Sequence, residues 1–250
     1  MKFFTGIFNV ADVKHFGQAF VSVHRLATRK SGFAVGEWIM DSGAFSTIAK
    51  HGGFPEPVSA YAAQIRRWKD NGTLLAAVAQ DYMCEPIQLA KTGLTVAEHQ
   101  RLTIERYDAL VAENTGVYIM PVLQGYASAE YVSHLRQYGD RLKPGMWVGV
   151  GSICKRNANP MAIWKVLDTI KDARPDLRLH GFGLKVTALK SPFIRELLHT
   201  ADSMAWSFAA RRERRDHCSW QTAKEFETRV NEICAVPACD AIADLFLGVA

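Results

Sequence analysis

Short hydrophobic runs alternate with longer amphipathic stretches along most of this chain. A strand followed by a helix, repeated many times, is typical of βαβ units and a parallel sheet. The runs that predict strands are Phe3–Val10, Trp38–Met40, Leu74–Ala79, Val117–Leu123, Met146–Val150, Leu177–Phe182 and a weaker run at Met204–Phe208. The stretches that predict helices are Pro57–Asn71, Val96–Asn114, Ala129–Leu142, Met161–Asp172 and Pro192–Thr200.

The number of units favours a closed barrel over an open nucleotide-binding sheet. No Gly-x-Gly-x-x-Gly segment follows the first predicted strand, and such a segment marks the open dinucleotide-binding folds. We therefore predict an α/β protein with a (β/α)8 TIM-like barrel, in a trimmed or irregular form, as a single domain over residues 1–250. From about residue 211 to 250 the pattern is helical and then loop-like, which predicts a small C-terminal helical extension.

The composition agrees with a globular protein of this kind. The chain has 250 residues, and 48% of them are hydrophobic, which is enough to bury a sizeable core. No window contains the roughly 18 apolar residues in a row that a membrane helix needs, and Met1–Gly6 resembles a first strand rather than a signal peptide. We therefore expect a cytoplasmic protein, bacterial or phage-encoded, that has no membrane partner.

The cysteine pattern and the net charge indicate the redox compartment and the kind of partner. The five cysteines are odd in number and widely spaced, a pattern that indicates a reducing compartment rather than a disulfide framework. The net charge is +5, which favours an anionic partner. A basic cluster of four residues is equally typical of a solvated helix face; it comprises Arg211, Arg212, Arg214 and Arg215.

Polar and small residues gather where the predicted strands end. In a parallel barrel the carboxyl ends of the strands meet at one mouth, where active sites form. Three of these ends carry an aspartate, at Asp41, Asp81 and Asp202. Others carry Gln124 and the Gly149–Ser152 segment. We expect these groups to converge on one ligand.

The residue types suit chemistry on a glycosidic bond. One carboxylate can attack an anomeric carbon, a second can move the proton of the departing base, and a third can accept hydrogen bonds from a purine edge. An amide and backbone N–H groups can read a carbonyl oxygen. Aromatic rings such as Phe45 and Phe182 can stack on a flat base.

Each residue also has a plainer interpretation. Asp-Ser-Gly is a common turn or helix cap, strand-end glycines are often ordinary turn residues, and phenylalanines are more often core than stacking surfaces. The functional hypothesis therefore depends on the order and spacing of the whole set.

That order resembles the tRNA-guanine transglycosylase superfamily. The matches begin at Asp41 and end near Ser207, in the family's order. They are Asp41-Ser42-Gly43-Ala44-Phe45 for the family's Asp-Ser-Gly-Gly-Phe, Pro121–Gly125 for its Val-Gln-Gly strand end, Val148–Ser152 for its glycine pair, His180–Gly183 for its His-Leu-Met-Gly-type segment and Ala201–Ser203 for its Phe-Asp-Ser.

The resemblance implies a role for each matching position. Asp202 would be the nucleophile at C1′ of the sugar, and Asp41 the general acid/base for the base proton. Asp81 would bind the guanine-like edge, and Phe45 and Phe182 would sandwich the ring. The full set of implied substrate-binding residues is Asp81, Gln124, Gly125, Gly151, Ser152, Phe45, Phe182 and Gly183.

The chain also departs from the tRNA enzymes. It is short, it has Gly151-Ser152 in place of Gly-Gly, and it lacks their closely spaced Cys-x-Cys-x-x-Cys zinc site. These departures make it most similar to the DpdA-type 7-deazaguanine DNA transglycosylases of phages and bacterial DNA-modification clusters. That similarity implies a pentosyltransferase that exchanges guanine in DNA for a 7-deazaguanine such as preQ0, with no cofactor required for the chemistry.

Two further predictions concern metal and DNA. A variant structural zinc site is one interpretation of His217, Cys218, Cys234 and Cys239, since three thiolates and an imidazole suit tetrahedral zinc. A DNA base must leave its stack to react, and cationic residues near the mouth would bind the flanking phosphates. The predicted contacts are Lys155, Arg156, Lys185, Arg211, Arg212, Arg214 and Arg215.

Three alternatives stay open at this point. The same chemistry can act on RNA, as a tRNA-guanine transglycosylase. A nucleoside hydrolase or glycosylase would use water in place of the incoming base. A non-catalytic DNA-binding barrel would keep the fold and the charge without the reaction. Neither the oligomeric state nor the inserted 7-deazaguanine follows from the sequence.

Overall fold

The computed structural model describes residues 1–237, and its strands form one parallel sheet. The sheet order is β5-β4-β3-β2-β1-β9-β8-β7-β6, and every pairing is parallel. The strands are β1 (Lys2–Gly6), β2 (Gln18–Ser22), β3 (Glu37–Asp41), β4 (Thr73–Val78), β5 (Ile119–Met120), β6 (Val122–Leu123), β7 (Trp147–Val150), β8 (Arg178–Gly181) and β9 (Leu198–Ser203).

The two ends of this sheet are consecutive in the chain, so the sheet closes into a barrel. Only Pro121 separates β5 from β6, and proline has no N–H to give to a ladder. The Met120 carbonyl accepts the Ala79 N–H at 3.0 Å on one side, and the Pro121 carbonyl accepts the Gly149 N–H at 2.8 Å on the other. The segment thus joins β4 to β7, which confirms the predicted TIM-like barrel.

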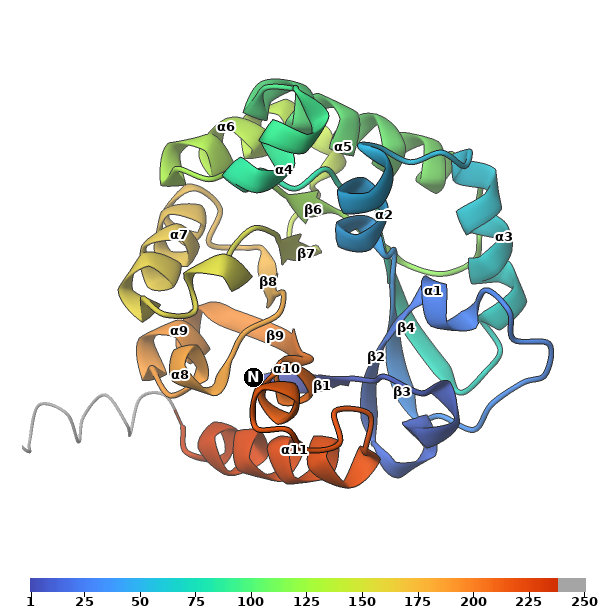
Figure 1. Ribbon diagram of the computed structural model, residues 1–250. Coiled ribbons are helices and arrows are strands. Elements are labelled where there is room, and N and C mark those ends of the chain that lie inside the picture. The colour runs from blue at the N-terminus through green and yellow to red at the C-terminus, as the bar shows by residue number, and fades with distance from the viewer. Residues whose placement is uncertain (238–250) are drawn as a thin grey trace, which may run out of the picture.

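Helices surround the barrel on the outside (Figure 1). The short α1 and α8 make this ring irregular, in agreement with the predicted irregular form. The helices are α1 (Val23–Leu26), α2 (Ala44–His51), α3 (Val58–Trp68), α4 (Pro86–Thr92), α5 (Val96–Ala112), α6 (Ser128–Tyr138), α7 (Pro160–Ala173), α8 (Val186–Leu189), α9 (Pro192–Leu197), α10 (Ala205–Arg212) and α11 (Trp220–Ala235), with 3-10 turns η1 (Val10–His15), η2 (Gly139–Arg141) and η3 (Cys154–Arg156).

One predicted strand was wrong, and one strand was not predicted. The run Met204–Phe208 is not a strand, because α10 begins at Ala205 and buries Trp206 and Ala210 one turn apart. The strand is the preceding Leu198–Ser203, and so the predicted helix at Pro192–Thr200 ends at Leu197. We also missed β2, whose alternating burial comes from a run of only five residues with polar ends.

The C-terminal helix packs against the barrel, which confirms the predicted helical extension. Helix α11 contacts β1, α8 and α10. The Phe226 ring lies 6.1 Å from that of Phe3, and the buried Glu227 accepts a hydrogen bond from Thr5. Within residues 1–237, no helix is both long enough and apolar enough to cross a membrane.

Strand alternation decides which side chains face the barrel interior. Successive side chains point to opposite faces of a strand, and Trp38 on β3 forms a T-shaped contact with Phe33, which packs on Trp68 of the outer helix α3. Asp41 has the opposite parity and lines the interior cavity. The same alternation puts Thr200 and Asp202 of β9 on one face.

Candidate active site

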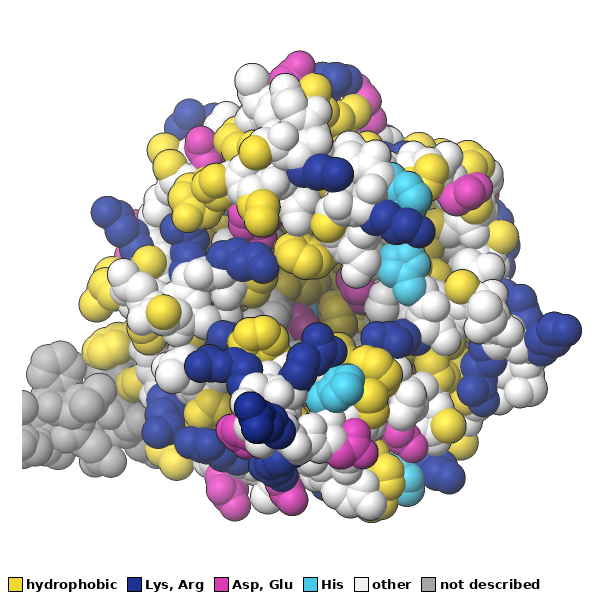
Figure 2. Space-filling model, in the orientation of Figure 1, with side chains coloured by type: hydrophobic (Ala, Val, Ile, Leu, Met, Phe, Trp, Pro, Cys, Tyr) yellow, Lys and Arg dark blue, Asp and Glu magenta, His cyan; other side chains and the backbone are white. Residues whose placement is uncertain are grey.

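A cavity of about 1110 Å³ opens at the carboxyl ends of the strands. Ligand pockets commonly measure roughly 300–1,000 Å³, so there is room for a base together with its sugar. Figure 2 shows the hollow at the centre of this face, with acidic side chains inside and Lys and Arg side chains around it. Of the ten residues predicted to act on or bind the substrate, nine line the cavity: Asp41, Phe45, Asp81, Gln124, Gly151, Ser152, Phe182, Gly183 and Asp202.

The exception is Gly125, which does not line the cavity. A Cβ on Gly125 would lie 3.0 Å from side-chain atoms of both Glu130 and Tyr131. Glycine at this position therefore lets α6 pack closely against the end of β6. Close packing of α6 therefore explains why glycine occupies this position of the motif.

Asp41 ends β3 and lines the cavity, where it is half-buried. Burial raises its pKa to about 6, and the nearby charge of Asp202 adds to this rise. Hydrogen bonds from the Gly43 backbone and the Ser22 side chain act in the opposite direction. A carboxyl group that titrates near neutral pH can both donate and accept a proton.

Asp81 belongs to a chain of hydrogen bonds with Gln124 and Ser152. The Gln124 amide Nε2 donates to Asp81 Oδ2, and the Ser152 hydroxyl donates to Gln124 Oε1 at 2.8 Å. The Cys84 N–H donates to the Ser152 oxygen at 3.1 Å. All three side chains are buried, so the chain fixes which way the amide of Gln124 faces.

Glycine and backbone strain shape this wall of the cavity. A Cβ on Gly151 would lie 2.1 Å from Gln124 Nε2. Any side chain at this position would therefore displace the Gln124 amide. Ser152 has a φ of 58°, a conformation that costs a non-glycine residue roughly 1–2 kcal/mol. The two hydrogen bonds of the Ser152 hydroxyl offset this strain.

The pKa of Asp81 predicts how stability depends on pH. Burial raises this pKa from 3.8 to about 7, so the folded protein holds the proton more tightly than the unfolded chain. This contribution to stability is full below pH 4 and is lost as pH rises to about 7. We expect Asp81→Asn to gain stability relative to wild type across this range, by at most about 4 kcal/mol at pH 8.

Urea unfolding at pH 4.5 and pH 8 checks this prediction, because the difference between variant and wild type must grow with pH. Glu98→Gln is the matched control: its carboxylate is exposed, and its pKa is lowered by the hydrogen bonds from Thr95 at the start of α5. That variant is expected to lose stability at pH 8. A constant gap between Asp81→Asn and wild type at both pH values would contradict the assignment.

Asp202 lies in β9 beside β8 and β1, and it is 6% exposed. Its Oδ1 accepts the Gly183 backbone N–H at 3.1 Å, and Nε2 of His180 lies 3.2 Å from the same oxygen. The carboxyl groups of Asp41 and Asp202 thus face one cavity.

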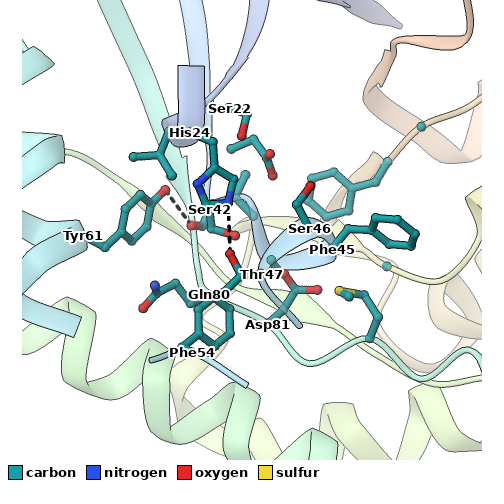
Figure 3. Close-up of a pocket in the computed structure, with 18 of the residues that line it drawn as sticks. Ser22, His24, Ser42, Phe45, Ser46, Thr47, Phe54, Tyr61, Gln80 and Asp81 are labelled. Carbon is teal, nitrogen blue, oxygen red and sulfur yellow. Dashed lines mark hydrogen bonds between the residues drawn. The ribbon is translucent and has the colours of Figure 1, made fainter. Parts of the chain in front are cut away.

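The two predicted stacking residues line the cavity at different depths. Phe45 is 47% exposed at the mouth, and the Lys155 ammonium lies 4.5 Å from its ring centroid. Phe182 lies deeper, where its ring occupies the space that a side chain on Gly149 would need. Tyr61 and Phe45 approach the cavity from opposite sides (Figure 3).

The three predicted cations beyond the strand ends each contact an exposed aromatic ring at the mouth. Lys155 lies over Phe45, Arg156 over Tyr126 at 4.5 Å, and Lys185 over Phe208 at 5.5 Å. These pairs connect neighbouring or opposite loops around the opening. They create a rim that offers cations and flat apolar faces together.

The arginine cluster lies at the end of α10 and in the turn that follows. Arg211, Arg212, Arg214 and Arg215 are all exposed, and none of them is part of the cavity lining. Arg215 forms salt bridges with Glu213 and Glu225, which neutralise much of its charge. The other three keep their charge free of salt bridges with the described residues.

The predicted zinc ligands come together only in part. The ligand atoms of Asp216, His217 and Cys218 lie within 4.8 Å of one another. Within residues 1–237 this group does not include Cys234, which packs against the hydrophobic core. Cys239 lies outside the described residues. A tetrahedral site needs a fourth donor, which this described group does not supply.

Several residues of the cavity were missed in the sequence. His24 follows the unrecognised strand β2, and its Nε2 lies 3.1 Å from the Gly43 carbonyl and 3.0 Å from the Thr47 hydroxyl (Figure 3). Glu85 is 3% exposed, lines the cavity and has one oxygen without a hydrogen bond from any described residue. Recognising β2 would have identified His24, whereas nothing in the local sequence marks Glu85.

The fold and this site define a parallel α/β barrel with a carboxylate-lined cavity at the carboxyl ends of its strands, which is where barrel enzymes have their active sites. Residues 2–243 match the family described as DpdA, DeoxyPurine in DNA protein A. The chain belongs to this family, which confirms the resemblance seen in its motifs and implies a transglycosylase enzyme. A comparison with curated proteins finds no match.

Proposed function

We propose that this protein exchanges guanine in DNA for a 7-deazaguanine such as preQ0, through a covalent intermediate on Asp202. The observation that carries the proposal is the convergence of Asp41, Asp81 and Asp202 on one cavity that has room for a nucleotide. Membership of the DpdA family supports the choice of polymer and base.

In the first half of the reaction, the Asp202 carboxylate attacks C1′ of the target nucleotide. The C1′–O bond forms as the bond from C1′ to the base breaks, and the electron pair leaves with guanine. Asp41 gives the departing base a proton. Asp81 accepts hydrogen bonds from the base edge, and the second Nε2–H of Gln124 and the Ser152 backbone N–H donate to its carbonyl oxygen.

In the second half, a 7-deazaguanine occupies the position that guanine has left. Asp41, now ionised, takes the proton from its ring nitrogen, and this nitrogen attacks C1′. The bond from C1′ to Asp202 breaks and the carboxylate is restored. Atoms and charges balance without a cofactor, because one base and one proton leave and equivalent ones return.

The mouth suits a nucleotide that has left its stack. Extruding a base from duplex DNA costs a few kcal/mol, which stacking surfaces and phosphate contacts at the opening can offset. Phe45, Tyr126 and Phe208 offer exposed rings, each with a cation beside it. We therefore propose that this rim binds the nucleotides that flank the target.

The salt dependence of DNA binding tests the rim. The ammonium groups of Lys155 and Lys185 form no salt bridge with a described residue. If each neutralises a phosphate, a variant with Lys155→Ala and Lys185→Ala is expected to flatten the plot of log Kd against log salt by about 2. Fluorescence anisotropy with a labelled oligonucleotide at several salt concentrations measures this slope.

Lys165→Ala provides the control, because Lys165 is an exposed lysine on α7, outside the barrel. Its slope should equal that of wild type. If both variants bind DNA with the wild-type slope, the phosphates lie elsewhere and the rim assignment is wrong.

The identity of the polymer and the base needs a direct assay. Labelled 7-deazaguanine is incubated with the protein and either plasmid DNA or tRNA, and the incorporated label is measured. Incorporation into DNA is the expected result. Incorporation into tRNA alone would establish the RNA-directed alternative, and free guanine with abasic sites would establish a glycosylase.

We propose zinc for the turn between α10 and α11, with Asp216 in place of Cys234 among the ligands predicted from the sequence. Asp216, His217 and Cys218 offer an oxygen, a nitrogen and a sulfur donor close together, a mixed set that zinc accepts. Bound zinc would hold this turn against Phe8, whose ring already contacts His217 at 5.7 Å. Metal analysis of the purified protein and of Cys218→Ser tests the proposal, since zinc must be present in the first and lost in the second.

A further inference from the structure

The two oxygens of the Asp202 carboxyl group have different surroundings. Oδ1 accepts the Gly183 N–H at 3.1 Å and lies 3.2 Å from Nε2 of His180. Oδ2 accepts no hydrogen bond from the residues that the structure describes, and Asp202 lines the cavity. One oxygen is thus held by the protein, and the other is available to a ligand.

The hydrogen bonds behind His180 determine where its ring proton lies. Thr200 Oγ1 accepts the Trp147 Nε1–H at 2.7 Å and lies 2.8 Å from Nδ1 of His180. The Thr200 hydroxyl proton needs an acceptor because the residue is buried, and among the described residues Nδ1 is the one within reach. Nδ1 therefore accepts this proton, and the ring proton lies on Nε2, directed at Asp202.

Aromatic packing holds the imidazole in this orientation. The Phe20 ring stacks on it at 5.7 Å with an interplanar angle of 14°, and the Phe182 ring meets it at 4.7 Å. His180 is 0% exposed. Its hydrogen bond to Asp202 thus needs no rearrangement when a substrate arrives, which is the condition for preorganised catalysis.

We infer that His180 is a positioning residue for the nucleophile: its Nε2–H and the Gly183 N–H hold Oδ1 of Asp202, so that Oδ2 is the oxygen that attacks C1′. This inference rests on the proposed function. The bond from Oδ2 to C1′ forms as the bond to the base breaks, and the base leaves with the electron pair and the proton from Asp41. His180 keeps its own proton throughout.

The same two donors affect the balance between free and glycosylated enzyme. A carboxylate oxygen accepts hydrogen bonds more strongly than the carbonyl oxygen of an ester does. The donors therefore favour the free carboxylate of Asp202 and assist its departure from C1′ in the second half of the reaction. Removing one donor must shift the equilibrium towards the covalent intermediate, which a purely structural role of His180 would not do.

The paired variants His180→Leu and His180→Gln test the inference. Glutamine offers an N–H near the position of Nε2, whereas leucine offers none at a similar volume. For His180→Leu at a fixed guanine concentration, we expect the ratio of covalent adduct to free enzyme on a denaturing gel to rise about tenfold. The rate of exchange should fall about 10–100-fold, and Kd for the free base should stay within about twofold. His180→Gln should remain within about threefold of wild type in every measurement.

Nuclear magnetic resonance of ¹⁵N-labelled histidine gives a second readout that needs no activity. The His180 signals, assigned by their absence in His180→Gln, should show the Nε2–H tautomer in the wild-type protein. The Nδ1–H tautomer would overturn the inference, even if the leucine variant does not fold.

The outcomes separate this inference from the proposed function. If the wild-type protein forms neither adduct nor exchanged DNA, the proposed function fails and the role of His180 fails with it. If wild type exchanges bases but the leucine and glutamine variants behave alike, only the role of His180 is wrong.

Discussion

Asp202→Ala is expected to abolish base exchange while leaving the binding of the free base intact. Neither Asp41 nor Asp81 is expected to replace Asp202 as nucleophile, because both act on the base itself in the proposed reaction. Loss of a covalent nucleophile commonly lowers the rate by about 10⁴-fold or more. The measurement is incorporation of labelled 7-deazaguanine into DNA, together with the covalent adduct on a denaturing gel when no incoming base is supplied.

Asp202→Asn refines this experiment, because the amide oxygen can still accept the hydrogen bonds of His180 and Gly183. It should preserve the shape of the site and still form no adduct. Both variants should bind free 7-deazaguanine with nearly the wild-type Kd, since the base contacts proposed for Asp81, Gln124 and Ser152 remain. Wild-type turnover in either variant would show that the nucleophile lies elsewhere or that the barrel binds DNA without catalysis.

The convergence of the three aspartates was predictable because it follows from strand position alone. Asp41, Asp81 and Asp202 stand where hydrophobic runs end, and a parallel barrel brings such ends together. The prediction held for Asp202 even though the neighbouring strand was misplaced. The run Met204–Phe208 resembles a strand in hydrophobicity, but its burial repeats every four residues, as in a helix.

Other features depend on neighbours that the linear sequence does not reveal. The hydrogen bonds of Thr200 join residues from β7, β8 and β9, and no local motif indicates that Trp147 and His180 meet there. The four arginines look like one basic patch in the sequence, whereas Arg215 is paired with glutamates of its own surroundings. Such pairings arise from tertiary packing and charge balance, so they are visible only in the folded chain.

Asp41→Asn is expected to slow both halves of the exchange by about 10²–10⁴-fold, the usual contribution of general acid–base catalysis. The exchange passes through a covalent intermediate, so kcat/KM for DNA and kcat/KM for the incoming base report the two halves separately. In the first half Asp41 must be protonated to protonate the departing base. In the second half it must be ionised to accept a proton.

The raised pKa of Asp41, about 6, determines the sign of each pH dependence. For wild type, kcat/KM for DNA should fall as pH rises through about 6, because the acid form disappears. The value of kcat/KM for the incoming base should rise with pH, because the base form appears, and its midpoint should lie lower, because esterified Asp202 no longer adds its charge to the pKa of Asp41. Asparagine does not titrate, so Asp41→Asn should lose both of these limbs, whereas Asp81→Asn should keep them and bind the base more weakly. If wild type shows these opposite pH dependences of kcat/KM and Asp41→Asn keeps them, another group that lines the cavity transfers the proton. Glu85 is the next carboxyl group to test.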